Sequence, residues 1–191
     1  MITARIKAWN SKVIGDLKPV DKADYCVLIV SLGLLIYTIT FALTSDITYD
    51  EAYTYMYYSI KSKPNFLAFD LANNHPLNSL LIYFSSFLFP YREFFIRLPN
   101  ILFLVLYLVY SIRISKSRVF LPIKMLAFSL LAFYHFLIPD FFSQARGYGM
   151  ASCLVLIFLY HFIQKDQSFT NIIRSFYILF LATFAFTGLI P

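Results

Sequence analysis

Residues 25–44 read YCVLIVSLGLLIYTITFALT, a run of apolar residues that contains no Asp, Glu, Lys or Arg. A helix rises about 1.5 Å per residue, so this run matches the hydrocarbon core of a bilayer, which is about 30 Å thick. The rest of the chain is also apolar, with 60% hydrophobic residues, 14% charged residues and a mean hydropathy of +0.69. A soluble domain of this length could not bury so much apolar surface. We therefore expect an all-α, polytopic membrane protein whose first crossing is residues 25–44.

The basic residues gather beside the apolar runs, and the formal net charge is +6. This placement is typical of residues that orient helices or meet lipid headgroups, so membrane lipids rather than nucleic acid are the expected partners. Five basic residues precede the first run, and the positive-inside rule then predicts that residues 1–24 form a cytoplasmic N-terminal segment. We expect the protein in the cell membrane, with the bacterial inner membrane favoured.

The apolar run at residues 77–89 is too short for a full crossing, because as a helix it would be about 20 Å long. Its apolar residues recur on one helical face, with Asn78, Ser85 and Ser86 on another, as in a helix that lies in the membrane interface. If this helix crossed, the basic cluster from Arg113 to Lys124 would face outward, against the positive-inside rule. We therefore expect it to lie flat on the membrane.

The remaining apolar runs complete the expected topology. Pro99 falls in the first turn of the second crossing, where its missing N–H costs nothing. The predicted crossings after the first are residues 98–114, 119–138, 148–163 and 175–190. The result is one transmembrane domain, residues 25–191, with about five crossings, a first outer loop at 45–97 and a second at 139–147.

Residues 48–58 read TYDEAYTYMYY and hold the chain's only adjacent carboxylates, Asp50 and Glu51. Thr48 and Glu51 have the spacing of a capping box, so both acids could simply begin a helix. Their expected position on the outer membrane surface also suits a general base that deprotonates a hydroxyl. Spacing alone leaves both readings open.

Three other polar residues fall in the two outer loops and have two readings each. His75 either begins the interfacial helix in a polar turn or, with Asp46 or Asp50, binds a divalent metal, although no ligand spacing indicates one. Asp140 is either a loop acid or a second active-site carboxylate. Arg146 is either an interfacial anchor or a guanidinium that grips a lipid phosphate. Cys26 and Cys153 lie within apolar runs and form no metal-binding pattern.

Four short motifs occur in an order that resembles the GT-C superfamily of membrane glycosyltransferases, in particular the RgtA/B/C/D-like and dolichyl-phosphate-mannose-protein mannosyltransferase-like group. They are Tyr49-Asp50-Glu51-Ala52-Tyr53, Asn74-His75-Pro76-Leu77, Arg97-Leu98-Pro99 and Ala145-Arg146-Gly147-Tyr148. Two motifs depart from the family pattern. One proline is missing after His75, and Gln144 stands where the family more often has Glu. The family is considerably longer, so the resemblance implies that this chain is the N-terminal portion of an enzyme and need not be active alone.

The resemblance implies inverting transfer of a sugar from a polyprenyl-phosphate donor to a lipid or glycan acceptor hydroxyl on the extracytoplasmic face. Asp50 is then the general base, Arg146 and Tyr148 bind the donor phosphate, and Glu51, His75 and Asp140 support the site. No cofactor is expected, although a divalent metal stays open. The alternatives are a transporter or flippase subunit for a lipid-linked glycan, and a non-catalytic membrane scaffold. A transporter would carry charges inside its membrane helices, and the predicted helices are almost free of them.

Overall fold

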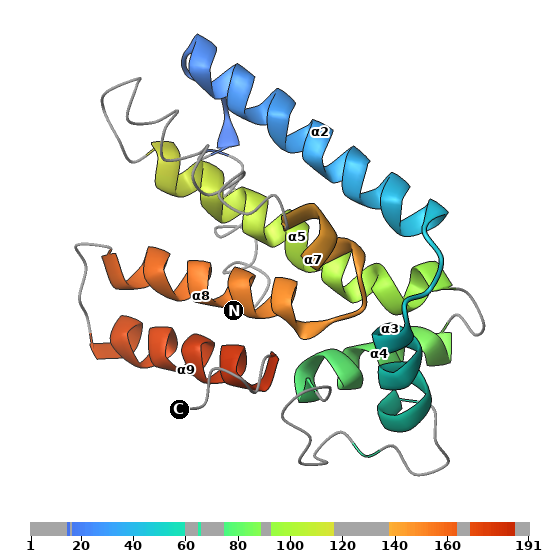
Figure 1. The fold of residues 1–191 in the computed structure, drawn as a ribbon. Helices are drawn as coiled ribbons and strands as arrows, with labels where there is room; N and C mark the ends of the chain where they lie inside the picture. Colours follow the sequence, from blue (N-terminus) through green and yellow to red (C-terminus); the bar gives the residue numbers. More distant parts are fainter. Residues whose placement is uncertain are drawn as a thin grey trace.

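A computed structural model describes residues 15, 17–59, 65, 75–88, 93–116, 138–163 and 169–185 of the chain. Within these residues all regular structure is helical, as the composition predicted (Figure 1). The elements are α2 (Lys22–Thr44), α3 (Tyr49–Thr54), a π-helical turn (Tyr55–Ser59), α4 (Pro76–Leu88), α5 (Glu93–Lys116), α7 (Ile138–Ser143), α8 (Gly147–Ile163) and α9 (Phe169–Ala185). The predicted crossing at residues 119–138 lies outside the described residues, apart from its last residue.

Two of the helices, α2 and α5, are long and apolar enough to cross a membrane. The α2 helix starts after Asp21, whose side chain accepts a hydrogen bond from the backbone N–H of Asp24, and most of its surface is exposed. The α5 helix is mostly buried, because α2, α4, α7 and α8 all pack around it (Figure 1). The shorter apolar helices α4, α8 and α9 complete the bundle.

The core of the bundle forms where α5, α7 and α8 meet. Leu104 and Tyr107 of α5 pack with Phe142 of α7 and with Cys153 and Leu156 of α8. The α9 helix lies along α8 and contributes small residues such as Ala182 and Ala185 to a second cluster. Small side chains at a helix contact let the two backbones approach closely.

The α2 and α5 helices run antiparallel. At one end Lys116 of α5 lies 3.5 Å from the carboxylate of Asp24 in α2. At the other end Arg97 of α5 donates hydrogen bonds to the carbonyl oxygens of Ala42 and Ser45, where α2 stops. The chain between α2 and α5 therefore leaves and re-enters the bundle at the same end.

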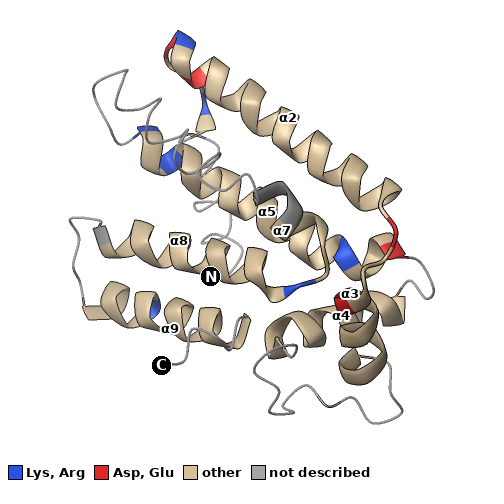
Figure 2. Ribbon diagram, viewed as in Figure 1, with Lys and Arg blue, Asp and Glu red and all other residues tan. Residues whose placement is uncertain are grey.

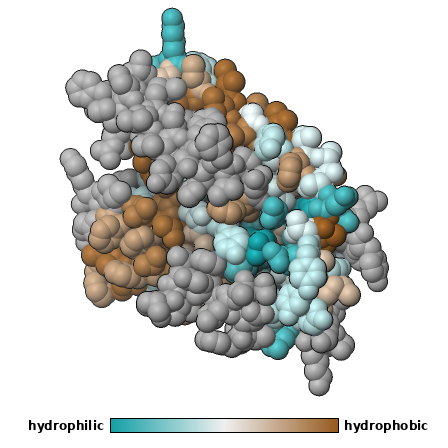
Figure 3. All heavy atoms as spheres, in the orientation of Figure 1, coloured by the Kyte–Doolittle hydropathy of each residue, from teal (hydrophilic) through white to brown (hydrophobic). Residues whose placement is uncertain are grey.

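Polar residues of α4 face the protein interior. Asn78, Ser85 and Ser86 are buried, whereas Phe87 and Leu88 are 78% and 68% exposed. The predicted polar face of this helix is therefore turned inward, whereas its apolar residues divide: Phe84, Phe87 and Leu88 are exposed, and Leu77 and Leu81 pack against the cluster around Met150. Among the coloured atoms in Figure 3, apolar atoms gather over α8 and α9, and hydrophilic atoms gather towards α3 and α4.

Three boundary predictions differ from the structure. The α5 helix begins at Glu93, so Pro99 lies inside the helix and not in its first turn; it cannot donate to the carbonyl of Phe95, four residues earlier. The loop predicted at residues 139–147 contains α7, whose Phe142 is anchored in the core. The last helix, predicted at residues 175–190, begins at Phe169, because periodicity marks a helix face better than it marks a helix end.

Candidate functional site

The α3 helix places Asp50 and Glu51 in its first turn, as the capping-box spacing predicted. The hydroxyl of Thr48 accepts a hydrogen bond from the N–H of Glu51 (3.3 Å), and a Glu51 carboxylate oxygen accepts one from the N–H of Thr48 (2.9 Å). Successive helical residues point in directions about 100° apart, so the two acids diverge. Glu51 is fully buried, while the Asp50 side chain is 41% exposed.

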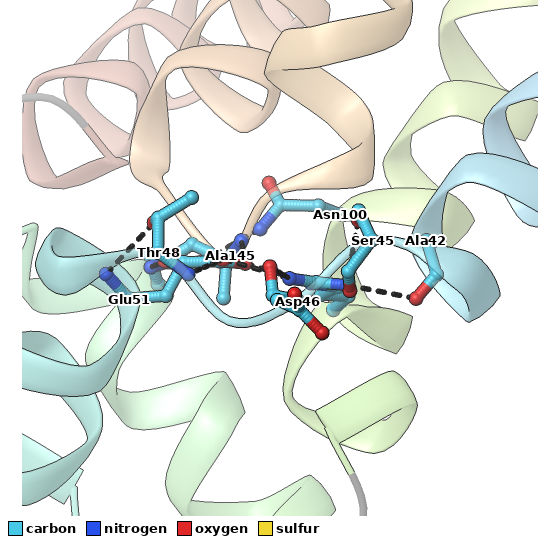
Figure 4. Close-up of polar contacts among 9 residues, drawn as sticks. Ala42, Ser45, Asp46, Thr48, Glu51, Asn100 and Ala145 are labelled. Carbon is cyan, nitrogen blue, oxygen red and sulfur yellow. Dashed lines mark hydrogen bonds and ion pairs between the residues drawn. The ribbon is translucent and has the colours of Figure 1, made fainter.

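Glu51 forms a buried, two-pronged ion pair with Arg97 of α5. The Nε and Nη2 atoms of Arg97 donate to the two carboxylate oxygens, each over 2.8 Å, and the two residues are 1% and 0% exposed. The remaining Arg97 donors reach the carbonyl oxygens of Ala42, Ser45 and Asp46 and the Ser45 hydroxyl. Figure 4 labels the acceptor residues Ala42, Ser45, Asp46 and Glu51. Such complete pairing is what a buried charge requires.

The same carboxylate also holds a distant loop. Glu51 Oε1 accepts a 2.7 Å hydrogen bond from the backbone N–H of Ala145, which lies between α7 and α8 (Figure 4). Burial by itself would raise the pKa of Glu51. The hydrogen bonds from Arg97, Thr48 and Ala145, together with the Arg97 charge, outweigh burial and hold the Glu51 pKa below its usual value.

Two buried asparagines form a second link to Ala145. Asn100 of α5 donates to the side-chain oxygen of Asn78 in α4 (2.9 Å), and Asn78 donates to the backbone oxygen of Ala145 (2.8 Å). Both side chains are 0% exposed. The backbone N–H and C=O of Ala145 are therefore both bonded to buried side chains from other elements.

Next to this buried network lies a half-exposed acid–base pair. Arg146 Nη1 is 3.0 Å from Asp50 Oδ2, and the Arg146 side chain is 23% exposed. The Arg146 guanidinium carbon lies 4.9 Å from the ring centre of Tyr148, and that ring meets His75 edge-on at 5.1 Å. The Arg146 guanidinium is thus held by a carboxylate on one side and an aromatic ring on the other, and an anion would bind it in competition with Asp50.

Close packing fixes the start of α8 beside this pair. A Cβ atom added at Gly147 would overlap the backbone oxygen of Ala185 at the end of α9 and would lie 2.7 Å from the Cβ of His75. Glycine is therefore the residue that lets the loop carrying Arg146 approach both elements. This contact gives a steric reason for glycine in the Arg146-Gly147-Tyr148 motif.

The structure brings together most of the residues that the sequence singled out. Asp50, Arg146, Tyr148 and His75 form one continuous set of contacts, and Glu51 lies beneath it as a structural carboxylate. Asp140 lies in α7, but its side chain is outside the described part of the chain. Among the described residues no group of three His, Cys, Asp or Glu could hold a metal ion.

The sequence did not predict the structural roles of Arg97, Asn78 and Asn100. A signal for two of them was present, because an arginine and an asparagine near the start of an apolar helix must find partners when buried. The sequence could not indicate which residues these partners are.

None of the family models, curated proteins or solved structures compared with the chain matches it.

Proposed function

We propose that the protein is a membrane glycosyltransferase of the kind the GT-C motifs imply. It would transfer a sugar from a polyprenyl-phosphate donor to an acceptor hydroxyl on the extracytoplasmic face, with inversion at the anomeric carbon. The observation that carries the proposal is the Asp50–Arg146 pair, a reachable carboxylate 3.0 Å from a guanidinium that rests on Tyr148. General-base catalysis and the binding of a leaving phosphate need a carboxylate and a cation in one site, and an inverting reaction uses them on opposite faces of the sugar.

In the proposed reaction Asp50 takes the proton from the acceptor hydroxyl. The acceptor oxygen forms a bond to the anomeric carbon as the bond from that carbon to the phosphate oxygen breaks. The electron pair of the broken bond leaves with the polyprenyl phosphate, and Arg146 stabilises the charge that develops there. A phosphate is a weakly basic leaving group, so no general acid is required.

Donor binding would separate the Asp50–Arg146 pair. A guanidinium binds the two oxygens of a phosphate as readily as those of a carboxylate. The donor phosphate would therefore compete with Asp50 for Arg146, and its arrival would free the base for the acceptor. The partial exposure of both side chains leaves room for this exchange.

The distribution of charge supports a membrane location. Figure 2 shows most charged residues of the described chain at the two ends of the bundle, and α8 contains no Asp, Glu, Lys or Arg. In our proposal α2 and α5 cross the membrane with the N-terminus in the cytoplasm, and α4 remains on the outer side. The return of the chain to the same end between α2 and α5 supports this arrangement, as do the exposed apolar side chains of Phe84, Phe87 and Leu88 at the end of α4.

The position of the site favours an enzyme over a transporter. A translocation pathway would need polar or charged groups facing one another along the middle of the bundle. The core between α5 and α8 is instead built of residues such as Leu104, Leu156 and Ile157. The polar residues of the candidate site gather at one end, where a surface reaction would take place.

The test is sugar transfer in membranes that contain the expressed protein. Polyprenyl-phosphate-linked hexose and pentose would be offered as donors, and Asp50→Asn compared with wild type. We expect Asp50→Asn to lower the transfer rate by at least about a hundredfold, the usual contribution of a general base. Glu93→Gln removes an exposed carboxylate at the start of α5 and is the matched control, expected to leave transfer unchanged. Transfer by Asp50→Asn at the wild-type rate would refute the proposal.

A further inference from the structure

Two residues of α5 one helical turn apart, Arg97 and Asn100, each pair with a side chain from another element. Arg97 holds Glu51 of α3, and Asn100 holds Asn78 of α4. Residues three apart on a helix lie on the same face. The two pairs are therefore parallel links that leave one face of α5.

Both links end on the same residue. Glu51 accepts a hydrogen bond from the N–H of Ala145, and Asn78 donates one to its C=O. Ala145 is fully buried, so neither backbone group can turn to water instead. We call the set of Arg97, Glu51, Asn100, Asn78 and Ala145 the polar brace.

The polar brace sits directly beneath the two residues of the candidate site. Glu51 follows Asp50 in the chain, and Ala145 precedes Arg146. Asp50 and Arg146, the two members of the half-exposed ion pair, are thus each covalently attached to a residue of the brace. A rotation of the peptide groups at Ala145 would move Arg146. It would also break a buried hydrogen bond, which costs about 1–3 kcal/mol.

We propose that the polar brace positions Arg146 against Asp50, with Asn78 and Asn100 as positioning residues that touch no substrate. The loop from Gln144 to Arg146 lies between α7 and α8 and belongs to neither helix, so regular helical structure does not make it rigid. The brace supplies that rigidity from α5, the central helix of the bundle. The consequence for sugar transfer rests on the proposed function, whereas the effect on the distance between positions 50 and 146 does not.

The informative variant is Asn78→Leu/Asn100→Leu. Replacing both partners of a buried hydrogen bond by apolar groups of similar shape is close to neutral for stability, while removing one partner leaves the other unsatisfied. The double variant removes the Asn78–Asn100 bond at little cost but leaves the buried C=O of Ala145 without its donor, which costs about 1–3 kcal/mol. Because domains are stable by about 5–15 kcal/mol, the variant should fold with this carbonyl released. Ser59→Ala is the matched control, because it removes a buried bond to the backbone of α4 at Ser79 that does not reach Ala145.

The first measurement reports how close positions 50 and 146 lie, and it requires no enzymatic activity. Cysteines introduced by Asp50→Cys/Arg146→Cys, with the exposed Cys26 changed to Ser, would be joined by a short bifunctional thiol reagent. We expect Asn78→Leu/Asn100→Leu to slow this cross-linking by about tenfold, the factor that corresponds to about 1.4 kcal/mol of lost hydrogen bonding. Ser59→Ala should leave the rate unchanged. An equal rate with and without the asparagines overturns the proposal.

The second measurement is the affinity for farnesyl phosphate, which carries the phosphate but no sugar. Asn78→Leu/Asn100→Leu should weaken binding by about tenfold in the wild-type background and have little effect once Arg146→Ala is present. Equal weakening in both backgrounds would mean that the asparagines act through general stability, and it would overturn the positioning role. If Asn78→Leu/Asn100→Leu slows cross-linking but the wild type binds no farnesyl phosphate, the positioning role of the polar brace would stand and the proposed function would be refuted.

Discussion

Replacing Arg97 by methionine tests whether Glu51 is a buried charge. The substitution keeps most of the side-chain volume and removes the guanidinium that satisfies both carboxylate oxygens. Breaking a buried ion pair from one side costs about 3–5 kcal/mol, because the other charge is left without its partner. Domains are stable by about 5–15 kcal/mol, so Arg97→Met should lower the unfolding midpoint strongly without abolishing folding.

The pH dependence of the stability lost in Arg97→Met is the more specific test of a buried charge. In the wild type the lowered pKa of Glu51 means that its stabilisation is present above the unfolded value of 4.5 and is lost as the pH falls through the lower folded value. Without Arg97, burial would dominate and raise the pKa of Glu51. The carboxyl would then take up a proton and become neutral at a higher pH, and the stability gap between variant and wild type should narrow as the pH falls from 7 to 4.

The assay is reversible denaturation in detergent micelles at pH 7 and at pH 4, followed by circular dichroism. Glu51→Leu/Arg97→Met removes both charges and should be more stable at pH 7 than Arg97→Met alone, even though it carries one substitution more. An Arg97→Met penalty that is the same at both pH values, together with a double variant weaker than the single one, would refute the reasoning. The Glu51 charge would then be stabilised without Arg97, by the backbone N–H groups of Thr48 and Ala145.

Three further predictions concern the surroundings of the site. Gly147→Ala should lower the thermal midpoint and weaken farnesyl phosphate binding together, because the added Cβ would push apart α9 and the loop that carries Arg146; a variant with unchanged midpoint and affinity would contradict the close packing. Thr48→Ala should destabilise the protein by about 1 kcal/mol through loss of the helix cap, measured by the same denaturation assay, whereas a change within error would mean that Glu51 alone holds the start of α3. Arg146→Lys should weaken farnesyl phosphate binding by about tenfold, since an ammonium cannot form two parallel hydrogen bonds to a phosphate, and equal affinity would argue for a simple point charge at this position.

The parts of the fold that depend on neighbouring residues could be predicted from the sequence. The apolar run at residues 25–44 predicted α2, and the helical spacing of apolar residues at 77–89 predicted α4. The capping box at Thr48 and Glu51 involves residues three apart, so its two hydrogen bonds were also predictable. Such signals fail at helix ends, where tertiary packing decides how far a helix extends, and α5 accordingly begins before Leu98.

The sequence by itself determined that the chain is helical and apolar and that Asp50 and Glu51 begin a helix together. Only the tertiary structure decided that these neighbours differ, with Glu51 buried against Arg97 and Asp50 facing Arg146 at the surface. The physical reason is that Glu51 finds its partners 46 and 94 residues away, in α5 and at Ala145. Helical periodicity reports which residues share a face, but a buried charge is satisfied only by the groups that packing brings to it.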